Sequence, residues 1–292
     1  MYHKRTRIGY HKVSRLIWIF ILIIGGYGLL QVFICVSFRI PSNSMNPALR
    51  NGDHVLVFKP LIGARIFNVL QAIHSRPTKI YRIPGIRGVT RNDILVFNNP
   101  FPNQFKKMGM SMKDYYIKRC IGLPGDTLSI ESGYFKVNGY SDRLGNDESQ
   151  QLLSWLDDHY FDDSSYKSWM SDSTFGWTIK NLGPLYIPQK GDLIAIDKKN
   201  YCLYKELIAW EQGMDVWWKN GMAYLDGQPL KSYRFKSNYY FMAGDNLFQS
   251  YDSRYWGLLP EELIVGKACL IWKSVHPTEG TLLKDRMMKR IE

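Results

Sequence analysis

Residues 38–47, FRIPSNSMNP, are the stretch around which the chain is organised. They follow directly on a long apolar run, and they place Ser44 between Pro41 and Pro47 with no charged neighbour beside it. Proline fixes its own φ angle and pushes the preceding residue out of the helical region, so this stretch is extended and cannot continue a helix. An extended serine just beyond an apolar segment is an unusual place for a structural residue. Ser44 is therefore a candidate nucleophile.

The apolar run before this stretch predicts a membrane anchor. Residues 16–38 contain no charged side chain, and a helix of that length spans about 34 Å, enough for a bilayer core of roughly 30 Å. A cleaved secretory signal is the alternative, but such signals have a shorter apolar core followed by a small-x-small cleavage site. Five basic residues and no acidic one precede the run. Residues 1–15 are therefore expected in the cytoplasm, and everything after the run outside.

Composition argues against several other function classes. The 292 residues suffice for one large domain or two modest ones. The net charge of +12 forms no long block, and no nucleic-acid-binding motif is present, so no nucleic-acid partner is predicted. The four cysteines are far apart in the sequence and form no CxxC pair, so they indicate neither a metal site nor a disulfide framework.

Beyond the central stretch, turn residues repeatedly lead into short apolar strands. Val, Ile, Phe and Tyr are enriched in these strands, and Gly, Asp, Asn and Pro bound them. Such recurring units are typical of an antiparallel all-β fold. The predicted units cover residues 54–58, 91–97, 115–122, 127–130, 134–137, 190–196 and 264–272, the last of them as a pair of strands.

The composition changes between residues 140 and 235, where Asp, Ser and Trp accumulate. Residues 151–159 and 205–212 have helical character, and residues 223–230 predict a hairpin because Asp-Gly fits a type I′ turn. We interpret this region as an insertion in the β core. The predicted organisation is a cytoplasmic tail (1–15), an anchor (16–38), a catalytic β core (39–139 and 236–275), an inserted domain (140–235) and a charged tail whose composition also permits a helix (276–292).

A serine hydroxyl is a poor nucleophile until a base takes its proton. None of the six histidines lies in a nucleophile elbow, so nothing favours a Ser-His-Asp triad, although sequence order does not exclude one. Lys118 lies on an otherwise apolar strand, where alternation puts it and Arg119 on opposite faces, so one of the two cations faces the core. Burial lowers the pKa of a lysine, and a neutral amine is a competent general base. The competing interpretation is a solvated lysine on an edge strand.

Four motifs resemble, in order, the boxes of the type I signal peptidases, which are membrane-anchored Ser/Lys proteases. Residues 38–45 resemble the nucleophile box, residues 91–97 the following strand box, and residues 116–126, YIKRCIGLPGD, the lysine box. Residues 244–257, with GDN followed by SYDSRYWG, resemble the last box. The resemblance covers the anchor and the β core. It implies a mainly β fold, with an antiparallel barrel or sandwich core, one N-terminal transmembrane helix and an inserted second domain.

The resemblance also implies roles for the residues that match the boxes. Ser44 is then the nucleophile and Lys118 the general base. The backbone N–H of Ser44 and the hydroxyl of Ser42 form the oxyanion hole. Ser250 donates or accepts a hydrogen bond that orients the amine of the lysine.

Further matching residues support the site or contact the substrate. Asp252 and Arg254 form an ion pair that supports the site without taking part in the chemistry. Met45, beside the nucleophile, contacts substrate or lipid. Three apolar residues line shallow pockets that admit only small side chains, with plain core packing as the alternative: Phe38, Ile40 and Ile117.

The implied function is a membrane-bound serine endopeptidase that removes N-terminal signal peptides from exported preproteins, without a metal or other cofactor. Its partners are preproteins with small residues at the cleavage site, and the lipid bilayer. It is expected in the bacterial inner (cell) membrane as a single-pass protein, with the catalytic domain in the periplasm or at the outer face. The site lies six residues beyond the predicted anchor, so it is expected close to the membrane surface. The sequence does not indicate an oligomeric state.

Two alternatives remain open. One is a specialised processing peptidase, such as a pilin maturase, with the same site and another substrate. The other is an inactive, membrane-tethered binding module, although such a module has no need of a buried lysine facing a serine. Two departures from the family pattern are Asn43 in place of glycine, and residues 247–249, LFQ, in place of Arg-Asp-Asn. Both lie off the Ser/Lys pair, so altered packing is expected rather than loss of catalysis.

Overall fold

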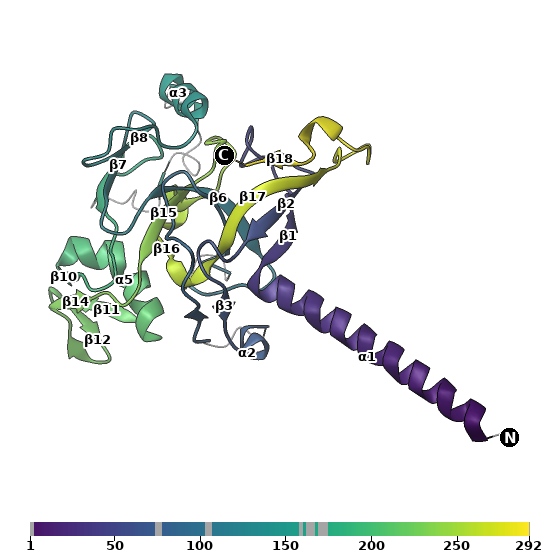
Figure 1. Ribbon diagram of the computed structural model, residues 1–292. Helices are drawn as coiled ribbons and strands as arrows, with labels where there is room; N and C mark the ends of the chain where they lie inside the picture. The colour runs from purple at the N-terminus through teal and green to yellow at the C-terminus, as the bar shows by residue number, and fades with distance from the viewer. Residues whose placement is uncertain are drawn as a thin grey trace.

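The structure is a computed structural model that describes residues 3–73, 78–102, 107–157, 160–161, 167–168 and 175–291. Its elements form one long N-terminal helix, an antiparallel main sheet and several small sheets with short helices around it. Figure 1 shows the helix projecting away from all the other elements.

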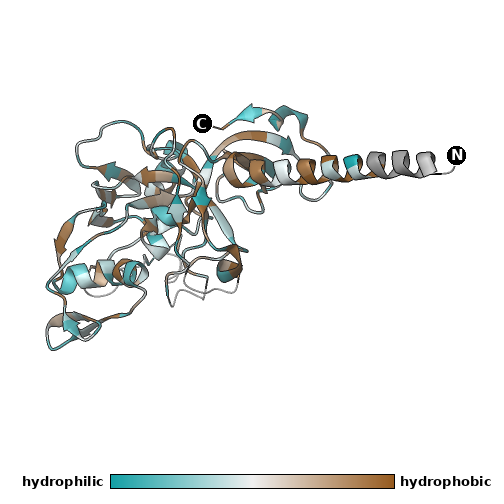
Figure 2. Cartoon of the chain, turned by 60° about the horizontal axis from the view of Figure 1, so that its bottom comes forward, coloured by the Kyte–Doolittle hydropathy of each residue, from teal (hydrophilic) through white to brown (hydrophobic). Residues whose placement is uncertain are grey.

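The projecting helix is α1 (His3–Phe33). Its segment Val13–Phe33 is long and apolar enough to cross a membrane, as judged by length and composition, and none of it is buried against the rest of the described chain. Figure 2 shows hydrophobic colours along the part of α1 nearest the sheet. A helix whose apolar side chains all face outward requires an apolar surrounding. The single N-terminal apolar helix expected from the sequence is confirmed.

The helix ends earlier than the sequence predicts. Residues Cys35–Arg39 form strand β1, which pairs antiparallel with β2 (Asp53–Phe58). The predicted anchor, residues 16–38, therefore includes residues that belong to the sheet. Lys59 marks the boundary, because its Nζ donates to the carbonyls of Gln31 at 2.7 Å and Val32 at 3.2 Å. A cation there satisfies carbonyls that the last helical turn leaves unpaired.

The main sheet is antiparallel throughout the described chain, and bulges bend its longest strand where it pairs with two neighbours. The mainly β antiparallel fold is thus confirmed. The hydrogen-bonded order is β1-β2-β17-β5-β6-β15-β16, with β18 beside β17. Besides β1 and β2, these strands are β5 (Ile94–Asn98), β6 (Tyr115–Gly122), β15 (Tyr239–Ala243), β16 (Leu259–Pro260), β17 (Ile264–Ser274) and β18 (Lys289–Arg290).

The C-terminal part differs from the sequence prediction in two ways. The expected strand pair over residues 264–272 is the single strand β17, which pairs with β2 on one side and β5 on the other. The tail over residues 276–292 is not an α-helix in its described part but folds back as η3 (Lys284–Arg286) and β18. Arg286 explains this return, because its buried guanidinium donates to Asp53 Oδ2 at 2.6 Å.

Within the described residues, the central part of the chain forms three small sheets and two α-helices. Helix α3 begins four residues before the predicted segment 151–159, and α5 begins seven residues before the predicted segment 205–212. The side chains of Asn146 and Asp197 cap these two helices and fix where they start. Residues 158–159 lie outside the described residues. The elements are β7 (Thr127–Glu131), β8 (Tyr134–Val137), α3 (Asp147–Trp155), β9 (Leu182–Tyr186), β10 (Leu193–Ala195), α5 (Lys198–Gln212), β11 (Val216–Lys219), β12 (Met222–Leu225), β13 (Gln228–Pro229) and β14 (Ser232–Arg234).

The remaining short elements flank the main sheet. The two-stranded sheet β3–β4 pairs Arg65 with Arg82 and Ile66 with Tyr81. The elements are β3 (Arg65–Ile66), α2 (Val69–Ile73), β4 (Tyr81–Arg82), α6 (Ser253–Trp256) and η2 (Glu261–Leu263). The predicted strands at residues 54–58 and 115–122 and the predicted hairpins β7–β8 and β12–β13 are all present. The turn of the second hairpin has positive φ at Asp226 and Gly227, as a type I′ turn requires.

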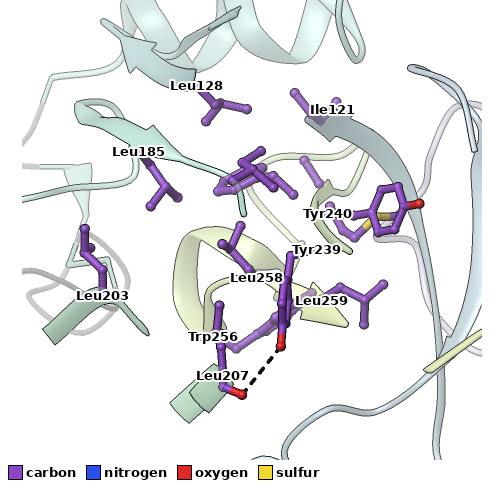
Figure 3. Close-up of a cluster of buried hydrophobic side chains, with 14 of the residues drawn as sticks. Ile121, Leu128, Leu185, Leu203, Leu207, Tyr239, Tyr240, Trp256, Leu258 and Leu259 are labelled. Atoms are coloured by element: carbon purple, nitrogen blue, oxygen red, sulfur yellow. Dashed lines mark hydrogen bonds between the residues drawn. The ribbon is translucent and has the colours of Figure 1, made fainter. Parts of the chain in front are cut away.

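One large core runs through both the main sheet and the central part of the chain. β7, from the predicted core, pairs with β9, from the predicted insertion. Figure 3 shows side chains of both regions meeting, among them Leu128, Leu207 and Tyr239, whose hydroxyl hydrogen-bonds to the Leu207 carbonyl at 3.5 Å. Residues 140–235 therefore share their apolar core with residues 39–139 rather than packing as a separate unit. A second, smaller cluster fills the region beneath Ser44.

Candidate active site

Ser44 and Lys118 meet in the interior of the protein. Lys118 Nζ lies 2.7 Å from Ser44 Oγ in a buried hydrogen bond, although the two residues are 74 positions apart in sequence. Only 6% of Ser44 and 5% of Lys118 are exposed. A serine and a lysine within hydrogen-bonding distance and shielded from water form the arrangement that a nucleophile and its base require. In the described chain, no histidine forms a hydrogen bond with the Ser44 hydroxyl, whose other hydrogen-bonded neighbour is the Ser42 hydroxyl.

The main sheet places Lys118, and a short turn places Ser44. Lys118 lies in the middle of β6, with β5 on one side and β15 on the other, so it is not an edge-strand residue. Ser44 follows β1 in a turn in which the Leu49 N–H donates to the Met45 carbonyl at 2.8 Å. Met45 is fully buried in the small core cluster beneath the turn. The side chain expected to contact substrate or lipid instead anchors the turn to the sheet.

Burial controls the protonation of Lys118. Removal from water lowers the pKa of Lys118 to about 8; the negative charges of Asp252 and Asp245 oppose this, and the positive charge of Arg254 adds to it. A buried ammonium has lost its hydration, so the neutral amine is favoured. The neutral fraction of Lys118 near neutral pH is therefore far larger than that of an exposed lysine, and the amine accepts a proton only in that form.

Asp252 and Arg254 form a fully buried ion pair below the site. Arg254 Nε and Nη2 donate to the two carboxylate oxygens at 2.9 Å each, and both side chains are 0% exposed. Burial alone raises the pKa of Asp252, but the adjacent guanidinium outweighs it and holds this pKa below its usual value. Asp252 also accepts from the Gly244 N–H at 3.0 Å, and Arg254 donates to the Leu247 carbonyl at 2.9 Å. The pair thus holds the loop after β15 in place.

The sequence did not reveal a second ion pair on the opposite face of β6. Arg119 Nε and Nη2 donate to the two oxygens of Asp245 at 2.7 Å each, and Asp245 is 1% exposed. Alternation correctly put Arg119 and Lys118 on different faces. The partner of Arg119 follows only from the pairing of β6 with β15, whose register sets Arg119 opposite Ala243. That register has no local sequence signal.

Gly244 is a further residue that the sequence analysis did not single out. A Cβ built at this position would lie 2.2 Å from Ser250 Oγ and 2.5 Å from the carbonyl oxygen of Ser44. Only glycine therefore lets the loop after β15 approach the nucleophile this closely. The Gly-Asp-Asn motif at residues 244–246 was the available signal, because it contributes both this glycine and Asp245.

The two other serines of the predicted site differ in their contacts. Ser42 Oγ donates to Ser44 Oγ at 3.4 Å, so its hydroxyl lies beside the nucleophile. Ser250 is buried, and its hydroxyl forms no hydrogen bond of standard geometry among the described residues, although it contributes to the lowered pKa of Asp252. The predicted bond from Ser250 to the lysine amine is absent from this structure. The Ser250 side chain lies against Gly244, and the amine of Lys118 is directed to Ser44.

Three apolar residues with a predicted pocket role gather beside the dyad. Ile40 is 2% and Ile117 9% exposed, and both belong to the small core cluster. Phe38 is half-buried against the same cluster, and its ring centroid lies 4.9 Å from that of Tyr115. The structure brings the three together, and each also contributes to core packing.

Asn43 is accommodated without an unusual backbone angle. It is not among the non-glycine residues with positive φ. Its side-chain oxygen accepts from the Asn51 N–H at 3.1 Å, and its carbonyl accepts from Asn246 Nδ2 at 3.3 Å. The asparagine therefore joins both ends of the nucleophile turn and connects it to the loop after β15.

Within the described residues, no group of three or more His, Cys, Asp and Glu side chains is arranged to hold a metal ion.

Comparisons with known proteins agree on one family. The family model for signal peptidase, peptidase S26, matches residues 13–273. Signal peptidase I of Buchnera aphidicola subsp. Schizaphis graminum is 29% identical, over 90% of this chain and 76% of the relative. Signal peptidase I of Buchnera aphidicola subsp. Acyrthosiphon pisum is 30% identical, over 86% of this chain and 72% of the relative.

More distant matches include signal peptidase I of Pseudomonas fluorescens, which is 27% identical over 84% of this chain and 67% of the relative. The crystal structure of a signal peptidase I from Enterococcus faecalis V583 aligns with a TM-score of 0.30 and 18% identity, over 63% of this chain and 98% of that one. Because the family model extends from the apolar helix through almost all of β17, this chain belongs to the signal peptidase family, peptidase S26.

Proposed function

We propose that Ser44 is the nucleophile and Lys118 the general base of this enzyme. As a member of the signal peptidase family, the chain is a serine endopeptidase that cleaves signal peptides. The observation that carries the assignment is the buried 2.7 Å hydrogen bond between Lys118 Nζ and Ser44 Oγ. The lowered pKa of Lys118 supports it, because a base must be neutral before it accepts a proton.

The proposed reaction begins with proton transfer from Ser44 Oγ to the neutral amine of Lys118. The Ser44 oxygen then attacks the carbonyl carbon of the scissile bond and forms a tetrahedral oxyanion. As the bond to nitrogen breaks, the Lys118 ammonium returns the proton to the leaving amine, and an acyl-enzyme remains. Water, deprotonated by the same amine, then attacks the acyl carbon. The bond from that carbon to Ser44 Oγ breaks, Oγ takes the proton back from the Lys118 ammonium, and the signal peptide leaves with a new carboxylate.

The groups around Ser44 suit the charge that develops in this reaction. The Ser44 N–H and the Ser42 hydroxyl are proposed to donate to the oxyanion, and the proximity of Ser42 Oγ to Ser44 Oγ supports this. Phe38, Ile40 and Ile117 are proposed to wall the pockets for the small side chains before the cleavage site. Bulky apolar walls there would exclude larger side chains sterically.

Substitution of each dyad member tests the assignment. Ser44→Ala removes the nucleophile, and Lys118→Ala removes the base. Each variant is expected to lose cleavage of a model preprotein by at least about a thousandfold in kcat/KM, while thermal unfolding remains cooperative. Loss of less than tenfold in either variant would discard the dyad. Mass-spectrometric detection of Ser44 acylated by a serine-directed inhibitor, present in the parent and absent in Lys118→Ala, is a second measurement.

The two alternatives are not favoured. A tethered binding module has no use for a buried amine that faces a serine, since burying a cation costs stability. A specialised processing peptidase would share every feature of the site and differ only in its substrate. Complementation of a strain with a conditional signal peptidase separates the general enzyme from a specialised one.

We also propose the position of the enzyme relative to the membrane. The apolar helix α1 is proposed to cross the cytoplasmic membrane of a bacterium once, with residues 1–15 in the cytoplasm and the catalytic sheet outside, in contact with the lipid surface. The substrate would then enter with its own apolar segment in the same bilayer. Sharing the bilayer aligns the scissile bond with Ser44 and reduces the entropic cost of encounter.

A further inference from the structure

An apolar groove that the proposed reaction does not use lies beside helix α3. It has a volume of about 320 Å³. Trp155 is 72% and Tyr160 71% exposed, which is unusual for side chains of this size. Exposed aromatic groups that gather around one depression mark a binding surface rather than a core. The residues lining this depression, the α3 groove, are Leu152, Trp155, Leu156, Tyr160 and Phe248.

The α3 groove is joined directly to the nucleophile turn. The Asn246 N–H donates to the Ser44 carbonyl at 3.1 Å, and the next residue, Leu247, donates its N–H to Ser149 Oγ of α3 at 2.9 Å. Phe248, which lines the groove, is the following residue in the chain. The loop after β15 therefore contacts the nucleophile turn on one side and the groove helix on the other. The groove belongs to the rim of the same site.

The position of the groove indicates which part of a substrate reaches it. Figure 1 shows α3 on the far side of the main sheet from α1. A preprotein whose apolar segment lies in the bilayer beside α1 approaches Ser44 from the α1 side. The residues after the cleaved bond then continue away from α1, toward α3.

We propose that the α3 groove binds an apolar stretch near the start of the mature portion of the substrate. The proposal rests on the proposed function, because the direction of the bound chain follows from the membrane anchor and from Ser44 as nucleophile. The occupant is a polypeptide segment that carries large apolar side chains a few residues after the cleavage site. It would make the enzyme selective for preproteins with such mature segments.

The chemistry of the groove fits this occupant. None of the five lining side chains is charged, so apolar segments are favoured over charged ones. Trp and Tyr offer large contact areas while only two side-chain torsions are fixed, which keeps the entropic cost of binding low. Phe248 is itself supported, since its ring is parallel to that of Phe161 within 2° at a centroid distance of 6.5 Å. Phe161 also contacts the exposed ring of Tyr160 edge-on at a centroid distance of 5.6 Å, so it supports two of the aromatic walls.

A pair of matched substrates tests the proposal on the full-length enzyme in phospholipid vesicles. The two preproteins are identical through the signal peptide and cleavage site, and differ only at about the third to eighth mature residues, where one carries Leu and Phe and the other Ser and Gln. The parent enzyme is expected to cleave the apolar substrate with a kcat/KM about tenfold higher, which corresponds to about 1.4 kcal/mol. Trp155→Ala is expected to reduce this ratio to below about threefold.

The ratio is insensitive to general damage, because both substrates undergo the same chemistry. Trp217→Ala is the matched control, since Trp217 is an equally large side chain, 63% exposed, on the remote strand β11. It is expected to keep the parental ratio. A parental ratio near one, or an unchanged ratio in Trp155→Ala, would overturn the proposal. Equal loss on both substrates in Trp155→Ala would overturn it as well, and would indicate contact with lipid or another protein. Failure of the parent to cleave either substrate would instead contradict the proposed function.

Discussion

At the scale of single residues, the protonation of Lys118 determines the pH dependence of activity. Burial lowers its pKa to about 8, so the amine is charged below that pH and neutral above it. Only the neutral amine accepts the Ser44 proton. We expect kcat/KM to rise with pH through about 8 and to level off above it, measured from about pH 6 to about pH 10. A profile that is already flat above about pH 7 would point to a histidine base instead.

The Asp252–Arg254 pair allows a second prediction at this scale. Arg254→Leu leaves the Asp252 carboxylate fully buried without its partner, and removing one member of a buried pair costs about 3–5 kcal/mol. The measurement is the free energy of unfolding in urea. Arg143→Leu is the control, because Arg143 forms an exposed pair with Asp147 at 3.2 Å, and its loss is expected to leave stability unchanged. Equal effects of the two substitutions would contradict a structural role for the buried pair.

The roles of site residues were predictable from the sequence where they depend on local motifs. Ser44 was singled out from the prolines around it, whereas the apolar strand made Lys118 only a candidate and the resemblance of four motifs to the family boxes assigned its role. The surroundings of Met45 and Ser250 were not predictable. Whether a side chain beside the nucleophile points into the core or outward, and whether a hydroxyl reaches an amine, depends on contacts between segments far apart in sequence. The sequence places such residues near the site without giving their orientation.

At the scale of elements, the loop after β15 has no room for a side chain at Gly244. Gly244→Ala puts a Cβ against Ser250 Oγ and the Ser44 carbonyl, both closer than 3 Å, so the nucleophile turn or the loop has to shift. A displacement of about 1 Å at a reacting group costs roughly a hundredfold in rate. We expect a loss of that order in kcat/KM with little change in KM.

Gly88→Ala is the matched control for this substitution. A Cβ at Gly88 meets no atom within 4 Å, so the same change of residue type is expected to leave activity at the parental level. Loss of activity in both variants, or in neither, would contradict the steric explanation.

The limits of element prediction are visible at the two ends of the main sheet. Strand β6 was predicted with its correct bounds, because its aromatic and β-branched residues end in a Gly-Leu-Pro-Gly turn. The end of α1 was misplaced, because residues 34–38 are uncharged and mostly apolar, a composition that fits either helix or strand. The pairing of β1 with β2 and the cap from Lys59 decide the boundary, and both are tertiary contacts. The hydrogen bond from Arg286 to Asp53, which folds the C-terminal tail back onto the sheet, is likewise a tertiary contact without a local sequence signal.

At the scale of the whole molecule, the proposed membrane orientation is open to direct test. With residues 1–15 in the cytoplasm, a reporter enzyme that is active only outside the cytoplasm should be active when it is fused in the surface loop at Gly139, where added atoms meet nothing within 4 Å. The same reporter fused at the N-terminus should be inactive. The reverse pattern would place the catalytic sheet in the cytoplasm and exclude preproteins at the outer face as substrates.

The single core shared by residues 39–139 and 140–235 was also not predictable. The composition of the insertion suggested a separate domain, but β7 and β9 pair across the predicted boundary, and buried residues of both regions form one cluster. Amino-acid composition indicates which residues favour exposure to solvent. The limits of a domain depend instead on which strands and helices pack their apolar faces together. The larger core therefore joins the main sheet to the central part of the chain, and the smaller cluster beneath Ser44 is separate from it.

Strand β1 sets the distance between the end of α1 and the nucleophile turn. Between the last turn of α1 and the nucleophile turn, the chain runs through five extended residues, which cover about 16 Å at roughly 3.3 Å each. Because Lys59 binds the carbonyls at the end of α1 and β2 pairs along all of β1, this spacer has a fixed length. With α1 across the membrane as proposed, this spacer sets the distance between the membrane surface and Ser44, so the enzyme is expected to cut bonds that lie about that far from the apolar segment of the substrate.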